Sequence, residues 1–281
     1  MVSGRDAADA VTESEVTRAG QPVAPPHRGR RIAFAVASGL FAVAAFGGLL
    51  GFSLVTGWFD NSDGGIHRVH MLGFGILYGL LLTVAALALT RRPEEKPSVF
   101  FQVVVVGLAA IIGALVSADG NYVVLGLIVI AAAAILLTLH PARAEVLRPT
   151  VSPSPLMGGL VLVGAVPLTG FALTMARLQR AGPPTDPHVS GDHWANMAAL
   201  AFGLVLVGLL ASARMRGWRF TAWCAGLGTA VYGVASIVFH RFPNTSVPYP
   251  GSEGTGWGLL ALIGGLIFIV VAEWEARRSR P

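Results

Sequence analysis

The sequence has a single cysteine, and this scarcity excludes several kinds of site. Cys224 lies within a long apolar stretch, so disulfides within the chain, cysteine-based zinc sites and dithiol redox chemistry are excluded. Charge is also scarce, because Asp, Glu, Lys and Arg make up only 12% of the 281 residues while 54% are apolar. A soluble domain of this size does not need so apolar a composition to build its core. We therefore expect the chain to be embedded in lipid.

Charged residues are absent from the middle of eight apolar stretches, each long enough to cross a membrane. About 20 residues of helix span the roughly 30 Å of hydrocarbon in a bilayer, and a helix satisfies its own backbone hydrogen bonds there. Proton-coupled carriers normally place an ionisable group at depth, so a proton-driven mechanism is disfavoured. We predict an all-α integral membrane bundle of eight transmembrane helices at residues 32–57, 66–90, 99–118, 121–140, 156–177, 193–213, 218–239 and 256–275.

The motifs of common enzymes are missing as well. No Ser, His and acidic residue stand at an interpretable spacing, and no Gly-rich loop with a phosphate-binding Lys occurs. Enzymatic activity is left open, with a non-catalytic role favoured. The pI is about 10.1, but the basic residues are spread over short loops and form no continuous patch, so we expect no nucleic-acid partner. The expected partner is the lipid bilayer.

Lysine is nearly absent, since 19 of the 20 basic residues are arginine and Lys96 is the exception. This preference, with abundant Ala and Gly, indicates a GC-rich bacterial genome. The basic residues gather near both termini and in alternate loops between the predicted helices. By the positive-inside rule, both termini lie in the cytoplasm and the chain crosses the bacterial cytoplasmic (plasma) membrane eight times. The exceptions on the opposite side are Arg68, Arg177, Arg180 and Arg241.

The chain divides into two membrane units with polar ends. Residues 1–31 are polar, contain proline and carry charges of both signs, so they cannot bury enough apolar surface to fold alone. We predict a disordered cytoplasmic tail at 1–31 and a second cytoplasmic tail at 276–281. Between them we predict two four-helix units, at 32–140 and 156–275.

Two pairs of similar segments suggest that these units are repeats. Gly51-Phe52-Ser53-Leu54 matches Gly170-Phe171-Ala172-Leu173 in the second unit. The second and sixth helices open with residues of similar type at the same spacing. Because each unit has an even number of helices, the halves are expected to be parallel, related by an axis along the membrane normal. The matched residues are His67, His70 and Met71 in the first unit and His193, Asn196 and Met197 in the second.

The outer ends of these two helices carry the best candidate ligands. Asp63, His67 and His70 fall at i, i+4 and i+7, so they share one face of a helix. Packing of the halves about their axis would bring His193 opposite them. We therefore predict a metal site at Asp63, His67, His70 and His193, or a haem held by the three histidines. Imidazole with the nearby thioether of Met71 suits copper, and imidazole alone suits haem iron. Alternatively, these residues cap helices among lipid headgroups.

The layout resembles that of the haem A synthase family. Eight helices in two halves of four, with Ile66-His67-Arg68 opening one helix and His193 opening its counterpart, carry the resemblance. It implies haem ligation by His67 and His193. The chain departs from that family at Gly64, where the family has an acidic residue, and at Asn121 and Trp257, near which the family places further histidine ligands.

The second unit also resembles multi-span proteins of actinobacteria that have no assigned role. The segments that carry this resemblance are Gly191-Asp192-His193-Trp194, Gly217-Trp218-Arg219 and Glu273-Trp274-Glu275. It implies a bacterial membrane protein and no particular activity.

Weak points in two helices suggest a different function. Gly48 loosens the first helix, and Pro167 falls at the matching position of the fifth, where it removes a backbone hydrogen bond. Interrupted helices at corresponding positions are a sequence pointer to a transporter's binding site. A second hypothesis is therefore a small-molecule or lipid transporter with Gly48 and Pro167 at its site. A third is a membrane scaffold or assembly factor without small-molecule chemistry.

Overall fold

The computed structural model describes residues 28–61, 65–242, 246–249 and 251–278. This part of the chain is helical, with one isolated β-bridge between Arg241 and Pro248. Within these residues, eight helical stretches are long and apolar enough to cross a membrane, which confirms the predicted all-α fold with eight helices of membrane-spanning length. Residues 1–27 of the predicted tail, 279–281 at the other end and Asp63 lie outside the described residues. Residues 28–31 already belong to the first helix.

The eight membrane-spanning stretches agree with the predicted ones to within a few residues at either end. Short helical segments connect some of them: η3 (Pro93–Glu95), α8 (Arg143–Leu147) and α10 (Pro187–Ser190). The spans in chain order are α2 (Arg28–Gly48) with α3 (Ser53–Thr56); α4 (Arg68–Phe74) with η2 (Gly75–Thr83) and α5 (Val84–Leu89); α6 (Pro97–Ser117); α7 (Gly120–Leu139); α9 (Pro155–Ala181); α11 (His193–Ser212); α12 (Trp218–Val238); and α13 (Gly254–Arg278).

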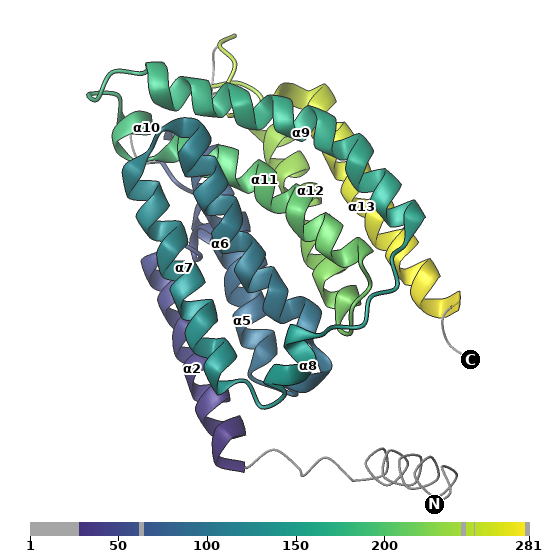
Figure 1. Ribbon diagram of the computed structural model, residues 1–281. Coiled ribbons are helices and arrows are strands. Elements are labelled where there is room, and N and C mark those ends of the chain that lie inside the picture. Colours follow the sequence, from purple (N-terminus) through teal and green to yellow (C-terminus); the bar gives the residue numbers. More distant parts are fainter. Residues whose placement is uncertain (1–27, 62–64, 243–245, 250, 279–281) are drawn as a thin grey trace, which may run out of the picture.

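Four spans form the centre of the bundle and four surround them. In the second, third, sixth and seventh spans, 56–78% of the most apolar stretch is buried, against 22–33% in the others. Figure 1 shows α2 and α7 on one side and α9 and α13 on the other, with α6, α11 and α12 between. The outer helices turn large apolar side chains such as Val43 and Val163 outward. Lipid tails are as apolar as these side chains, so their exposure costs little in a membrane.

The first two spans are irregular where they meet. Helix α2 ends at Gly48, at the weak point predicted from sequence, and α3 begins only at Ser53. The neighbouring span contains a nine-residue π-helix, η2. Gly75 at the start of η2 lies against α3. A Cβ at residue 75 would collide with the backbone of Leu54, so glycine permits this close contact between the two spans. In contrast, α9 continues through Pro167 as one helix of 27 residues.

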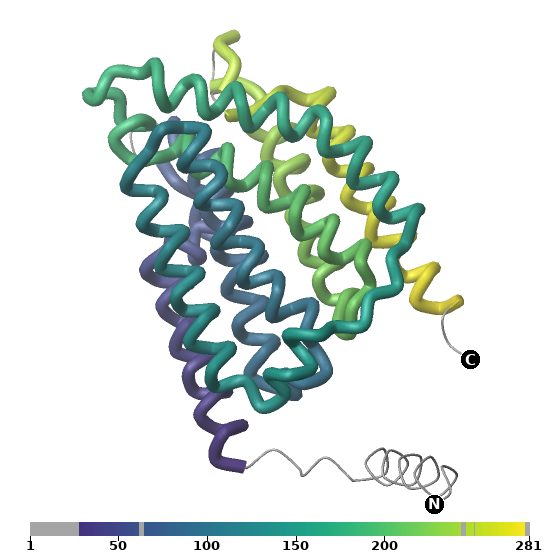
Figure 2. Tube along the Cα trace, in the orientation of Figure 1, coloured from purple at the N-terminus to yellow at the C-terminus, as the bar shows by residue number. Residues whose placement is uncertain are grey.

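The two ends of the bundle differ in their charged residues. We call the end that carries the start of α2, the end of α13 and the α11–α12 connection the arginine end. There Arg219 forms a bidentate pair with Glu273 at 2.6 and 3.2 Å, and Arg214 pairs with Glu275 at 3.2 Å. The arginine end is the lower part of the molecule in Figure 2, and the first and last described residues both lie there. The opposite end, at the start of α4 and α11, we call the histidine end.

Candidate metal centre

Four histidines converge at the histidine end, and we call them the histidine cluster. His67 directly precedes α4, His70 lies in α4, His188 lies in α10, and His193 begins α11. The ring centroids of His67 and His193 are 4.6 Å apart, and the ring of His188 lies 4.8 Å from those of both His67 and His70. Helix α4 and α11 pack against each other in the bundle centre, so residues at their starts meet.

The chain around His188 holds its ring in one orientation. Asp186 caps α10, and its Oδ1 accepts a hydrogen bond from the backbone N–H of His188 at 2.9 Å. The same oxygen lies 3.0 Å from His188 Nδ1. Burial opposes ionisation of Asp186, yet these hydrogen bonds from His188 outweigh it and lower the pKa of the carboxyl. Within the described residues, His188 Nε2 is buried and makes no hydrogen bond, which leaves that nitrogen available as a ligand.

A carboxylate behind a histidine is the usual outer partner of a metal ligand. It fixes which ring nitrogen carries the proton and raises the basicity of the other. Asp186 and His188 have this relation, and Pro187 between them limits the backbone at the start of α10. Three donors then meet, because one nitrogen each of His67, His188 and His193 lies within 4.8 Å of the others.

The distance between two of these nitrogens is close to the distance between two nitrogens that bind the same metal ion. His67 Nδ1 and His193 Nδ1 are 3.1 Å apart. Two imidazole nitrogens on one tetrahedral ion, with bonds of about 2.0–2.1 Å, lie roughly 3.3 Å from each other. The His67–His193 pair therefore needs almost no movement to share an ion. The third nitrogen, at up to 4.8 Å, must approach by about 1.5 Å, which is within reach of a side-chain rotation.

His70 lies beside this triad. Its ring is fully buried, stacks on His193 with centroids 5.4 Å apart and meets the edge of Trp194 at 4.8 Å. Neither of its ring nitrogens makes a hydrogen bond of ordinary geometry in the described part of the chain. A buried polar group without a partner costs about 1–3 kcal/mol, so an ion or ordered water bound here would offset that cost.

One side of the cluster opens into a cavity of about 660 Å³. His67, Met71 and His193 line it from the cluster side. The guanidinium of Arg68 is fixed beside it, because its Nε donates to the backbone oxygen of Asp60 at 2.6 Å and a terminal nitrogen donates to Asn61. The other walls come from α3 and the residues around it: Phe52, Val55, Thr56, Phe59, Asp60 and Asn61.

The segment between α12 and α13 covers another side of the cluster. The hydroxyl of Tyr249 accepts from the backbone N–H of Arg68 at 2.8 Å and donates to the backbone oxygen of Gly65. Burial raises the pKa of Tyr249 to about 12 despite the contact with Arg68, so it remains a neutral donor. The hydroxyl of Tyr232 donates a hydrogen bond to the backbone oxygen of Gly251 at 2.8 Å. Gly251 in turn packs against His70.

An acidic pair lies next to the cluster without joining the triad. Burial, followed by the hydrogen bond and charge of Asp119, raises the pKa of Asp192 to about 6. Asp119 Oδ2 accepts a hydrogen bond from the amide nitrogen of Gln179 at 3.1 Å. Asp119 also caps α7. The pair thus ties the start of α11 to the α6–α7 turn.

The structure brings most of the predicted ligands together and adds one. His67 and His193 meet as predicted, with His70 next to them and Met71 on the cavity wall. His188 is not among the ligands predicted from the sequence, but the structure places it beside His67 and His193. The signal that could have found it is Asp186-Pro187 before it, since an acidic cap followed by proline is a helix start.

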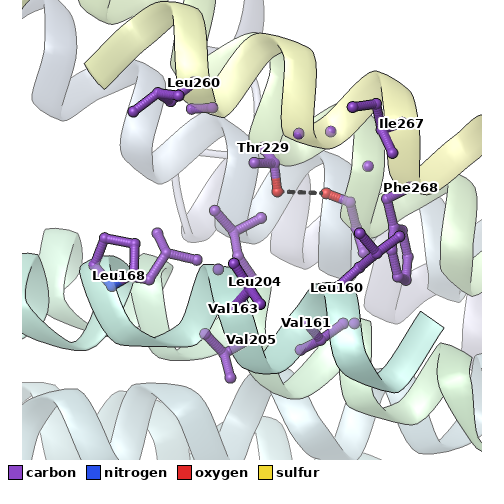
Figure 3. Close-up of a pocket in the computed structure, with 18 of the residues that line it drawn as sticks. Leu160, Val161, Val163, Leu168, Leu204, Val205, Thr229, Leu260, Ile267 and Phe268 are labelled. Atoms are coloured by element: carbon purple, nitrogen blue, oxygen red, sulfur yellow. Dashed lines mark hydrogen bonds between the residues drawn. The ribbon is translucent and has the colours of Figure 1, made fainter. Parts of the chain in front are cut away.

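Gly48 and Pro167 do not meet around a common cavity. Helix α2 packs against η2, α5 and α7, whereas α9 packs mainly against α11, α6 and α13. Pro167 lines a separate apolar cavity of about 320 Å³ between α9 and α11–α13, and Gly48 is not part of it. In Figure 3, Leu168 of α9 and Leu260 of α13 lie on opposite sides of this cavity. The hydroxyl of Thr229 faces it while bonded to the backbone oxygen of Ala225.

No protein family, curated protein or solved structure matches the chain. The geometry of the histidine cluster is therefore the strongest indication of what the protein binds.

Proposed function

We propose that this protein binds one late transition-metal ion at the histidine end, with copper favoured, through His67, His188 and His193. The observation that carries this proposal is the buried Nε2 of His188, held by Asp186 beside the two other imidazoles. Three ring nitrogens from three separate segments of the chain do not gather this closely for helix capping. Helix capping needs one side chain at each helix start, and only Asp186 among these residues acts as a cap.

The donor set narrows the choice of ion. Three neutral imidazoles suit copper, zinc, iron and nickel, while magnesium and calcium prefer oxygen. The thioether of Met71 on the wall of the same cavity suits copper best among these metals. His70 is placed to support the site as a further nitrogen donor or through its contact with His193.

A compact ion fits this geometry better than haem does. In a bis-histidine haem site the macrocycle lies between the two rings, whereas His67 and His193 are in direct contact at 3.1 Å. The haem ligation implied by the family resemblance would require these rings to separate. Copper or another bare ion requires only a small adjustment.

The placement of the site in the cell follows from charge and symmetry. The excess of arginine at the arginine end supports cytoplasmic termini, and the histidine end then faces the outside of a bacterial plasma membrane. Parallel four-helix halves are supported by burial, which is high in the second and third spans of each half and low in the first and fourth. His67 and His193 occupy matching positions, and their contact is what residues next to a two-fold axis would make.

Metal analysis of the purified protein tests the proposal. We expect about one copper or zinc ion per chain after dialysis, and a triple variant His67→Ala, His188→Ala, His193→Ala that retains none. His240→Ala is the matched control, because His240 is exposed and lies outside the cluster. Wild-type protein that takes up no more ion than the triple variant would contradict the proposal. A Soret band that depends on His67 would instead favour haem.

A second candidate function is supported by the apolar cavity at Pro167. Its lining is almost wholly apolar and includes the outward-facing Val163 and Leu260, so a hydrocarbon chain from the surrounding lipid can enter it. We expect Gly164→Leu, which has open space for the added side chain, to reduce lipid that copurifies with the protein. Gly170→Leu is the control on the same helix, with equal space but outside the lining. Equal lipid content in both variants would remove this candidate.

A further inference from the structure

We infer that the proposed metal ion keeps one coordination position open toward the cavity beside His67 and His193, where it takes a small anionic ligand from outside the membrane. This inference rests on the proposed metal site and assigns its reactive side. Structural metal sites are closed by four protein ligands, while reactive ones have three and leave the fourth position to water or substrate. The number of protein donors and the position of the cavity decide whether this site is structural or reactive.

Among the described residues, three histidines bring one nitrogen each to the site. One nitrogen each of His67, His188 and His193 lies within 4.8 Å of the others, and no carboxylate among the described residues joins them. His70 is on the side away from the cavity, since it is fully buried and absent from the lining. Among the described residues, Met71 is the donor left on the cavity side, and a molecule in the cavity is the other source of a fourth ligand.

The cavity lies where that fourth ligand would bind. Two of the three histidines form part of its wall, so an ion they hold is exposed to its interior. Its volume of about 660 Å³ far exceeds the roughly 30 Å³ that one water molecule occupies. The remaining space accommodates a molecule larger than water.

Charge and polarity favour an anion with a short apolar part. Three neutral imidazoles leave the ion's positive charge uncompensated, and the guanidinium of Arg68 is fixed beside the cavity by Asp60 and Asn61. Among the described residues that line the cavity, Asp60 carries the one carboxylate, and these positive charges outnumber it. The wall that Val55 and Phe59 contribute is apolar and largely exposed, so a short hydrocarbon part of the anion can pack against it.

Azide binding to the copper-loaded protein tests the open position. Azide that replaces water on Cu(II) changes the visible absorption and the electron paramagnetic resonance spectrum. We expect such a change in the wild-type protein. Thr56→Trp, which places a large ring in the cavity from an exposed position on α3, should weaken azide binding at least tenfold while one copper per chain remains. Val43→Trp, exposed on α2 and outside the lining, is the matched control.

The apolar part is tested by competition between carboxylates. Hexanoate should displace azide at least tenfold more strongly than acetate, because each buried methylene contributes about 0.8 kcal/mol. Equal competition by the two acids would overturn the apolar part of the assignment.

The possible failures are distinguishable. A protein that binds no copper contradicts the metal site itself. A protein that binds copper but whose spectra do not change at high azide concentration has a closed site, which overturns the inference alone. Azide binding that is equal in Thr56→Trp and wild-type protein would show that the ligand does not enter through this cavity.

Discussion

Both ends of the bundle bury histidine, but they do so in different ways. At the arginine end, His140 packs between the rings of Phe34 and Phe100, and its Nδ1 accepts a hydrogen bond from the backbone N–H of Ala142 at 3.1 Å. At the histidine end, the rings of His67 and three other histidines contact one another. Burial of one imidazole among aromatic rings is ordinary packing, whereas gathering several is costly without a ligand.

The charged groups show the same contrast. Glu273 and Glu275 at the arginine end are paired with Arg219 and Arg214, so their charges are balanced by neighbouring side chains. Among the described residues of the histidine end, Asp186 contacts the ring of His188 and orients it. Ionisable groups concentrated at one place in a membrane protein mark a functional site more reliably than scattered ones do.

Removal of a triad ligand should have the largest effect. We expect His193→Ala to weaken copper binding at least a hundredfold, more than loss of an outer partner does, measured by competition with a chelator of known affinity. His140→Ala should leave copper affinity unchanged. If the two variants lose affinity equally, the contrast between the two ends is wrong.

Loss of the carboxylate behind His188 should have the next largest effect. Asp186→Ser keeps a helix cap but cannot also reach the ring, and we expect it to lower metal affinity 10- to 100-fold. Asp186→Asn keeps an acceptor without the charge and should lose less. The same chelator titration measures both, and unchanged affinity in Asp186→Ser would contradict the orienting role.

His140 at the arginine end should make stability depend on pH. Burial lowers the pKa of His140 to about 4, so the folded protein keeps it neutral while the unfolded chain protonates near pH 6.5. Stability should therefore be full above that pH and fall as the pH decreases toward 4. Between pH 7.5 and 5.5 the expected loss from this residue is about 1.3 kcal/mol.

The measurement is thermal unfolding in detergent after treatment with a chelator, so that metal binding at the histidine cluster does not contribute. His140→Leu should remove most of this pH dependence relative to wild type. A variant with the same pH dependence would show that other groups cause it.

The smallest effect is expected for the surface pair at the arginine end. Arg219→Ala should lower stability by about 0.5 kcal/mol or less, since Arg219 and Glu273 are partly exposed and such pairs contribute 0.2–1 kcal/mol. Chemical denaturation in detergent can detect a change of this size. A loss above 2 kcal/mol would mean that the pair is structurally more important than the exposure of its side chains indicates.

The predicted ligands and the structure differ most at His188. The similar spacing of residues around His67 and His193 was visible in sequence, and the structure brings these two histidines into contact. His188 lies in the connection between α9 and α11, where no helical period relates it to the other ligands. Its place depends on how α10 folds back against the ends of α4 and α11. Asp63 lies outside the described residues, so its role stays a prediction.

The amino-acid sequence by itself determined the number of membrane spans and their limits, because the cost of placing charge or open backbone in hydrocarbon acts on each segment separately. Only the tertiary structure decided that span one is interrupted against a π-helix, that Pro167 faces α11–α13 rather than Gly48, and that His188 completes the triad. Those outcomes depend on side-chain packing between helices. Since apolar side chains fit lipid and protein about equally well, hydropathy alone does not specify which helix faces which.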